Sequence, residues 1–180
     1  MIDAKAQVKS KAVEKALAGY AQTAKNRRPL MRDIASRLKT RVDMGFRQAK
    51  DPWGGKWAPL AFRNGQPLKD TGRLARSFTG QASDDEAQVG TNVCYALVHQ
   101  FGTTIQAGNP KVSNVCGYEP KGAPFLQFKA GGRTIRAKEV TIPARPMLPI
   151  TPDGQATLPD PWAEDVLDAV TTRMEAAANG

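Results

Sequence analysis

"PLMRDIASRLKTRVDMGF", Pro29 to Phe46, is the stretch from which the fold can be read most directly. Apolar side chains recur in it every four residues, at Leu30, Ile34, Leu38, Val42 and Phe46. Residues at this spacing share one face of an α-helix. The pattern therefore predicts an amphipathic helix over about 29–50, with that face turned toward a core.

The segments on either side of this helix are read in the same way. Apolar residues at spacings of three and four predict another helix over roughly 2–25, which Asn26 to Pro29 ends. After the central helix, "DPWGGKWAPL" contains two prolines and a Gly-Gly pair, so it is predicted to be a turn-rich loop. We expect Trp53 and Trp57 in this loop to pack over the sheet or the second helix.

Short elements follow. "LKDTGRLARSF" predicts a short helix with Asp70 or Thr71 as its cap, and with Leu74 and Phe78 on the same side. The segments "SFTGQAS" and "AQVGTN" flank "DDE", which predicts a hairpin with an acidic turn. "CYALVHQFG" predicts another short helix that Gly102 stops, with apolar residues toward the core and His99 and Gln100 on its outer side.

The second half of the chain begins with an irregular region. The residues after Gly102 are rich in Gly, Pro and Asn, so 103–135 is treated as a long excursion. "FLQFKA", "GG" and "RTIRAKEVTI" predict a second hairpin, and prolines at 143, 146 and 149 must end its last strand. "PDPWAEDVLDAVTTRMEAAA" predicts a final helix with an apolar face of Trp162, Val166, Leu167, Val170 and Met174.

These elements predict an α+β fold. N-terminal helices pack on an antiparallel β-sheet, with a short central helix and a C-terminal helix. At 180 residues the chain suits one domain, 1–180. Within it we distinguish the N-terminal helices (1–50), the sheet region with its excursion (51–150) and the C-terminal helix (151–180).

The charge of the chain is uneven. The formal net charge is +9, but residues 1–80 hold 18 Lys and Arg against 6 Asp and Glu, whereas residues 81–180 hold 8 against 11. A basic half attracts either phosphates or an acidic face of a neighbouring subunit. Arg32, Arg37 and Arg41 are therefore candidates for an interface or for the lining of a lumen, and ordinary solvated surface is the alternative.

Composition also bears on the compartment. The N-terminus lacks the apolar core of a signal peptide, and no apolar run approaches the roughly 20 residues that span a bilayer. We therefore expect no membrane association and a protein made in a reducing cytosol. Cys94 and Cys116 match no zinc spacing, and we expect two unbridged thiols rather than a disulfide.

No motif for catalysis is present. The chain lacks the common phosphate-, dinucleotide-, zinc- and calcium-binding patterns, and with one histidine it cannot form a three-imidazole site. Cys94 and His99 are a nucleophile and a base by type only, because five helical residues place them about 140° apart around the axis. We predict no catalytic residues, no cofactor and no metal, and hence no enzyme.

Four motifs in order make the sequence specific. They are the turn around Trp57, "LKDTGRLARS" (68–77), "VGTNVCYALVHQFG" (89–102) and "IPARPML" (142–148). Together they resemble the phage virion morphogenesis family, the tail completion proteins of Mu-like and related contractile-tailed phages. The long excursion between Gly102 and Ile142 departs from the usual pattern of the family.

The resemblance implies a structural protein of the virion neck, assembled in the host cytoplasm. Several copies, six by analogy with tail symmetry, would form a ring that completes the head-proximal end of the tail or joins it to the head connector. Tail tube, sheath and connector proteins are the implied partners, and DNA would pass through the ring. A basic nucleic-acid-binding module is the alternative function.

The resemblance gives the motif residues a scaffold role. Gly72 and Gly102 would permit turns, Tyr95 and Phe101 would fill the core, and Pro143 and Pro146 would end a strand. The complete set of motif residues is Trp57, Gly72, Leu74, Tyr95, His99, Phe101, Gly102, Pro143, Arg145 and Pro146.

Overall fold

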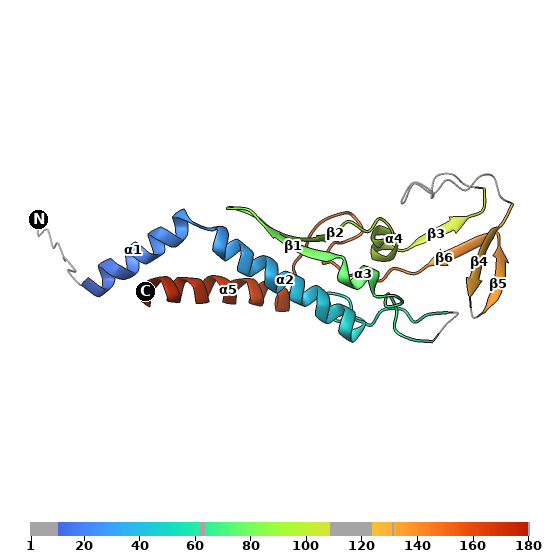
Figure 1. Ribbon diagram of the computed structural model, residues 1–180, viewed down its shortest axis with the longest axis horizontal. Helices are drawn as coiled ribbons and strands as arrows, with labels where there is room; N and C mark the ends of the chain where they lie inside the picture. Colours follow the sequence, from blue (N-terminus) through green and yellow to red (C-terminus); the bar gives the residue numbers. More distant parts are fainter. Residues whose placement is uncertain (1–10, 62–63, 109–123, 131, 180) are drawn as a thin grey trace, which may run out of the picture. The chain divides into compact units, whose positions relative to one another are not determined.

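A computed structural model describes residues 11–61, 64–108, 124–130 and 132–179 (Figure 1). The helices are α1 (Lys11–Lys25), α2 (Arg28–Gln48), α3 (Arg73–Arg76), α4 (Ala96–Phe101) and α5 (Asp160–Asn179). The strands are β1 (Phe78–Ala82), β2 (Ala87–Thr91), β3 (Thr103–Gln106), β4 (Leu126–Ala130), β5 (Arg133–Ala137) and β6 (Glu139–Ile142). The α+β class is confirmed, with helices at both ends of the described chain.

The strands form three separate two-stranded sheets, in place of the single sheet expected from the sequence. These are the hairpin β1–β2, the hairpin β4–β5 and the pair β3–β6 (Figure 1). In β3–β6, which is antiparallel, Thr103 lies opposite Ile142 and Gln106 opposite Glu139. The hairpin β1–β2 with its acidic turn is as predicted.

The run "RTIRAKEVTI" was expected to be one arm of a hairpin, and this is wrong in part. Only Arg133–Ala137 pairs with β4, whereas Glu139–Ile142 pairs with β3. The run is divided at Lys138, where the chain leaves one sheet and joins another. Likewise, the start of the predicted excursion is strand β3, and residues 109–123 lie outside the described part of the chain.

The chain divides into two compact units. Of the described residues, unit 1 contains 11–38, 80–88 and 161–179, and unit 2 contains those within 39–79 and 89–160. The prediction of a single domain stays a prediction.

The core of unit 1 lies where α2 meets α5. Leu30 and Ile34 are buried there against Ala169, as the four-residue spacing predicted. Val166 and Val170 pack against the same cluster, but Leu167 is 65% exposed, so its place on the predicted apolar face of α5 is wrong. α1 and α5 approach closely at Gly19, where an added Cβ would overlap the carbonyl oxygen of Ala177.

The core of unit 2 is built around aromatic rings. Phe46, at the end of the apolar stripe of α2, stacks edge-on against Trp57 at 5.3 Å and lies 5.6 Å from Phe78. Phe78 and Val42 are the most fully buried large side chains described. Trp57 therefore packs on the second helix as predicted, whereas Trp53 is 47% exposed.

Within the described residues, none of the helices combines the length and the apolar character needed to cross a membrane.

Candidate functional site

The sequence motifs converge in unit 2 on the segment 142–150. Trp57 reaches it from the loop after α2, and its indole Nε1 donates a hydrogen bond to the carbonyl of Pro146 at 2.8 Å. The segment contains three prolines, which lack backbone N–H groups. Ile142 ends β6 and Ile150 forms a single bridge with Ala156, and between them several backbone groups are bonded by side chains from elsewhere.

Arg145 fixes this segment, which we call the proline-rich segment, to the loop after α2 that contains Trp57, which we call the tryptophan loop. Its side chain is 6% exposed, and its Nε and Nη2 donate to the carbonyls of Ala58 at 2.8 Å and Pro59 at 3.0 Å. Its backbone N–H donates to the carbonyl of His99 at 2.7 Å. One residue thus joins the loop, α4 and the proline-rich segment.

The side-chain amide of Gln100 forms four hydrogen bonds. The prediction that Gln100 lies on the outer side of α4 is wrong. Gln100 is 4% exposed. Its Oε1 accepts from the backbone N–H groups of Met147 (2.8 Å) and Leu148 (3.1 Å), and its Nε2 donates to the carbonyls of Leu148 (2.8 Å) and Ile150 (3.3 Å). The side-chain amide therefore substitutes for a neighbouring strand, and no local pattern marks it apart from its i, i+4 spacing from buried Ala96.

The two motif glycines both have positive φ. Gly72 (φ 76°) lies directly before α3, where the Thr71 hydroxyl accepts the backbone N–H of Arg73 at 3.3 Å, and Leu74 is buried. Gly102 (φ 69°, ψ 166°) ends α4, and a Cβ there would lie 2.7 Å from the backbone nitrogen of Ala144. Both positions therefore require glycine, as expected from their place at turns.

A polar pocket of about 280 Å³ lies beside His99, and we call it the histidine pocket. Its lining consists of Leu60, Leu68, Asp70, Thr71, Gly72, Arg73, Leu74, Tyr95, His99 and Arg145. The Tyr95 ring meets the imidazole edge-on at 6.0 Å. The imidazole Nδ1 is buried and has no hydrogen-bond partner among the described residues. Burial, and then the charge of Arg145, lower the pKa of His99 below 6.5.

An apolar groove of about 320 Å³ lies on the other side of α4. Leu97 and Phe101 line it and are 60% and 39% exposed, so the expectation that Phe101 fills the core is wrong. Tyr95 is only half buried. The apolar groove is closed at its base by buried residues that include Phe78, Val93 and Met147.

Cys94 also lines the apolar groove, and it is disulfide-bonded. The expectation of two unbridged thiols is therefore wrong for Cys94, while Cys116 lies outside the described residues. Cys94 precedes α4, which begins at Ala96. A bridged sulfur is not a nucleophile. In this state Cys94 and His99 do not form a catalytic pair.

The candidate interface arginines lie along α2 and do not share one environment. Arg37 pairs with Asp168 of α5 at 2.6 Å, and Arg173 of α5 pairs with Asp33 of α2 at 3.6 Å. Arg32 is exposed, and no residue of the described chain pairs with it. Arg41 is half buried and has its own interaction. The acidic face of α5 thus meets basic residues of its own chain.

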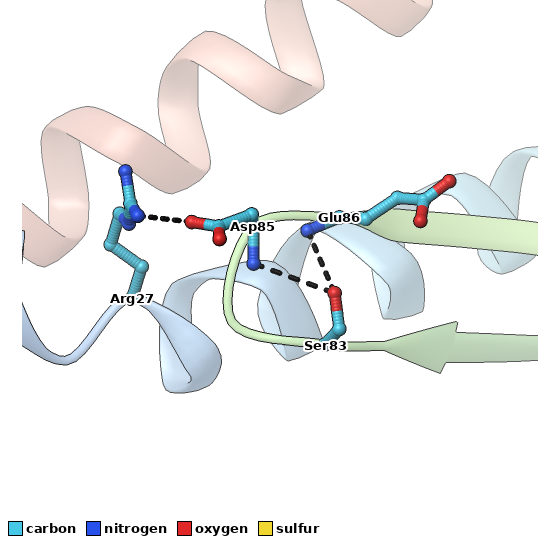
Figure 2. Close-up of polar contacts among 4 residues, drawn as sticks. All are labelled: Arg27, Ser83, Asp85 and Glu86. Carbon is cyan, nitrogen blue, oxygen red and sulfur yellow. Dashed lines mark hydrogen bonds and ion pairs between the residues drawn. The ribbon is translucent and has the colours of Figure 1, made fainter.

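The acidic turn of β1–β2 also pairs with a basic residue of the same chain (Figure 2). The Ser83 hydroxyl accepts the backbone N–H groups of Asp85 at 3.4 Å and Glu86 at 3.1 Å, and the Asp85 carboxylate pairs with Arg27. Part of the basic excess of residues 1–80 is therefore neutralised within the chain. No three His, Cys, Asp or Glu side chains among the described residues are grouped so that they could hold a metal ion.

Comparison with known proteins supports the family to which these motifs point. Residues 8–166 match the phage virion morphogenesis family. The chain belongs to this family. It is 33% identical over 156 residues to the "Mu-like prophage FluMu G protein 2" of Haemophilus influenzae, which covers 87% of each chain. It is 25% identical over 164 residues to the "Putative capsid assembly protein G" of Escherichia phage Mu, covering 83% of this chain and 81% of that protein. No solved structure matches the chain at a significant level.

Membership of this family makes the chain a phage virion morphogenesis protein. The contacts of the motif residues fit that assignment, since Trp57, Gln100 and Arg145 all bond backbone groups of other segments. Their arrangement builds a scaffold around the proline-rich segment.

Proposed function

We propose that this chain is a structural virion protein of the phage neck. Several copies form a ring, six by analogy with tail symmetry, which completes the head-proximal end of the tail and joins it to the head connector. The protein has no enzymatic role. Family membership over residues 8–166 supports an assembly function, and the names of the two relatives concern a Mu-like prophage and capsid assembly.

The observation that supports association between copies of this chain is the apolar groove beside α4. Leu97 at 60% and Phe101 at 39% exposure place large apolar side chains in water next to a hollow of about 320 Å³. Exposed apolar patches of this kind mark protein contacts. A contact between two different surfaces of identical subunits closes into a ring when its rotation allows.

Sedimentation of the purified protein, together with negative-stain images of the protein and of virions, tests the proposal. We expect ring-shaped particles and a ring at the top of the tail. Leu97→Ala should weaken association because burying the exposed part of a leucine contributes about 1–2 kcal/mol, roughly a 5- to 30-fold change in the dissociation constant per contact. Leu167→Ala is the matched control, since this leucine of α5 is also helical and 65% exposed.

Two results would contradict the proposal. One is a protein that stays monomeric at all concentrations and is missing from virions. The other is normal neck assembly in phage that lack the protein.

The alternative is a basic nucleic-acid-binding module, which the charge of residues 1–80 favours. The ion pairs of Arg27 and Arg37 reduce that charge, whereas exposed Arg32 retains it. This function would be supported if the protein binds duplex DNA and the logarithm of its binding constant falls steeply and linearly with the logarithm of the salt concentration. Passive contact with passing DNA inside a ring should give weak binding and no sequence preference.

A further inference from the structure

The charge of Arg145 is buried without a counter-charge. Its guanidinium contacts the carbonyls of Ala58 and Pro59, which are neutral dipoles. The ion pairs Arg27–Asp85, Arg37–Asp168, Lys39–Asp43 and Arg173–Asp33 of the described residues do not include it. Asp70 lines the same pocket and has an interaction of its own, and burial lowers the pKa of Arg145. A buried cation normally has an anionic partner, because taking it out of water is costly.

A second polar group in the histidine pocket also lacks a partner. The Nδ1 of His99 is buried and unbonded among the described residues. A neutral imidazole has one donor and one acceptor nitrogen, and a buried one normally uses both. Two groups with unmet requirements, a cation and an imidazole, therefore line one pocket.

We propose that the histidine pocket binds a carboxylate that another protein chain supplies, as an aspartate or glutamate side chain or a chain terminus. The two bonds of Arg145 to carbonyls use two of the five N–H donors of a guanidinium, and three remain. Arg73 lines the same pocket and adds positive charge. His99 Nδ1–H supplies a further donor in that tautomer.

The shape of the pocket favours a carboxylate on an aliphatic stem. Leu60, Leu68 and Leu74 line it beside the polar groups, and its volume of about 280 Å³ admits a side chain. The groups that face His99 are Tyr95 directly before its own helix, Asp70 and Arg73 from the α3 region, and Arg145 from the proline-rich segment. The carboxylate site rests on these contacts alone, whereas its use in virion assembly rests on the proposed function.

Nuclear magnetic resonance of His99 tests the site without ambiguity, because it is the only histidine in the chain. Full-length protein labelled with ¹³C at histidine Cε1 would be titrated with sodium acetate, with sodium chloride keeping the ionic strength constant. We expect a saturable shift of the single signal and an upward shift of the His99 pKa, since an anion stabilises the imidazolium. Neutral acetamide should give neither change.

Variants separate binding from folding. Arg145→Gln should abolish the acetate response, but it also removes two structural hydrogen bonds. Arg73→Gln, at an exposed position, should keep the fold and weaken acetate binding about 2- to 5-fold, as a partly screened charge would. Arg133→Gln, exposed on β5, is the matched control and should change nothing. The proposal is overturned if acetate shifts His99 no more than sodium chloride does, or if inorganic phosphate binds more tightly than acetate.

The source of the carboxylate is decided by self-association. If a second copy of this chain supplies it, the His99 signal should reach its acetate-bound position on concentration alone, and acetate should compete. If another virion protein supplies it, the signal should stay unchanged in the homo-oligomer and move when tails lacking this protein are added. If the chain proves monomeric, the proposed ring fails, while the acetate titration of the monomer still decides the pocket.

Discussion

Replacing Gln100 by leucine tests whether a side-chain amide holds the proline-rich segment in place. Leucine has a similar size, so the change removes the amide while leaving little empty space. The substitution leaves the N–H of Met147 without a partner in a buried position, and it also frees groups of Leu148 and Ile150 in partly buried positions.

The expected loss follows from these positions. An unsatisfied buried group costs about 1–3 kcal/mol, and water can reach some of the freed groups, so we expect a loss of roughly 2–4 kcal/mol in the free energy of unfolding. At about 2–4 °C per kcal/mol for a chain of this size, the melting temperature should fall by roughly 4–16 °C. Urea unfolding followed by tryptophan fluorescence gives the free energy, with the m-value showing whether the transition keeps its character.

Gln106→Leu is the matched control. The Gln106 amide donates to Glu139 on an exposed surface of β3–β6 at 3.0 Å, so its loss should cost under about 0.5 kcal/mol. A Gln100→Leu protein as stable as the Gln106→Leu protein would refute the reasoning, because the segment would then be held by packing alone.

Three further outcomes are expected. Trp57→Phe should cost about 1–2 kcal/mol through the lost indole hydrogen bond, measured by urea unfolding, and Trp53→Phe at a 47% exposed position should cost almost nothing. Gly102→Ala should lower stability by roughly 2 kcal/mol or more through its positive φ and close neighbours, whereas Gly90→Ala, with no atom within 4 Å of the new Cβ, should be tolerated. The lowered pKa of His99 means that the unfolded chain binds a proton more readily, so stability should fall as pH drops below about 6.5. Between pH 7.5 and 5.5 the melting temperature should therefore fall less for His99→Gln than for the unchanged protein. Equal falls in melting temperature would contradict this.

The long helices could be predicted because their pattern is repeated. An apolar residue recurs at five positions along one face of α2, and four of them, Leu30, Ile34, Val42 and Phe46, are buried. The six residues of α4 offer two faces instead, one with Val98 and Phe101 and one with Ala96 and Gln100. Hydrophobicity favours the first face. The structure buries the second, because backbone groups 47 and 48 residues away require the amide of Gln100.

Long-range pairing explains the other differences. In "RTIRAKEVTI" the apolar residues fall at 135 and 137 in the first half and at 140 and 142 in the second, and this change of phase is the only local sign of a break near Lys138. It does not show that the two halves pair with different strands. Similarly, the bonded state of Cys94 depends on which segment lies near it, and this is not encoded in spacing. The positions of Trp57, Gly72, Leu74 and Gly102 were foreseen because turns and aromatic packing have local signals.

The contacts of the proline-rich segment fix its length. Within 145–150, Arg145 meets the tryptophan loop, Pro146 accepts the indole, and Met147, Leu148 and Ile150 bond Gln100. Inserting or deleting one residue would displace every later partner by one position. Apart from the single bridge of Ile150 to Ala156, residues 145–150 pair with no strand of the described chain along which the register could slide. This irregular stretch should therefore be less tolerant of length changes than the exposed turn at Ser83–Glu86. Among related chains, gaps should accumulate at such turns and be rare between Ile142 and Ile150.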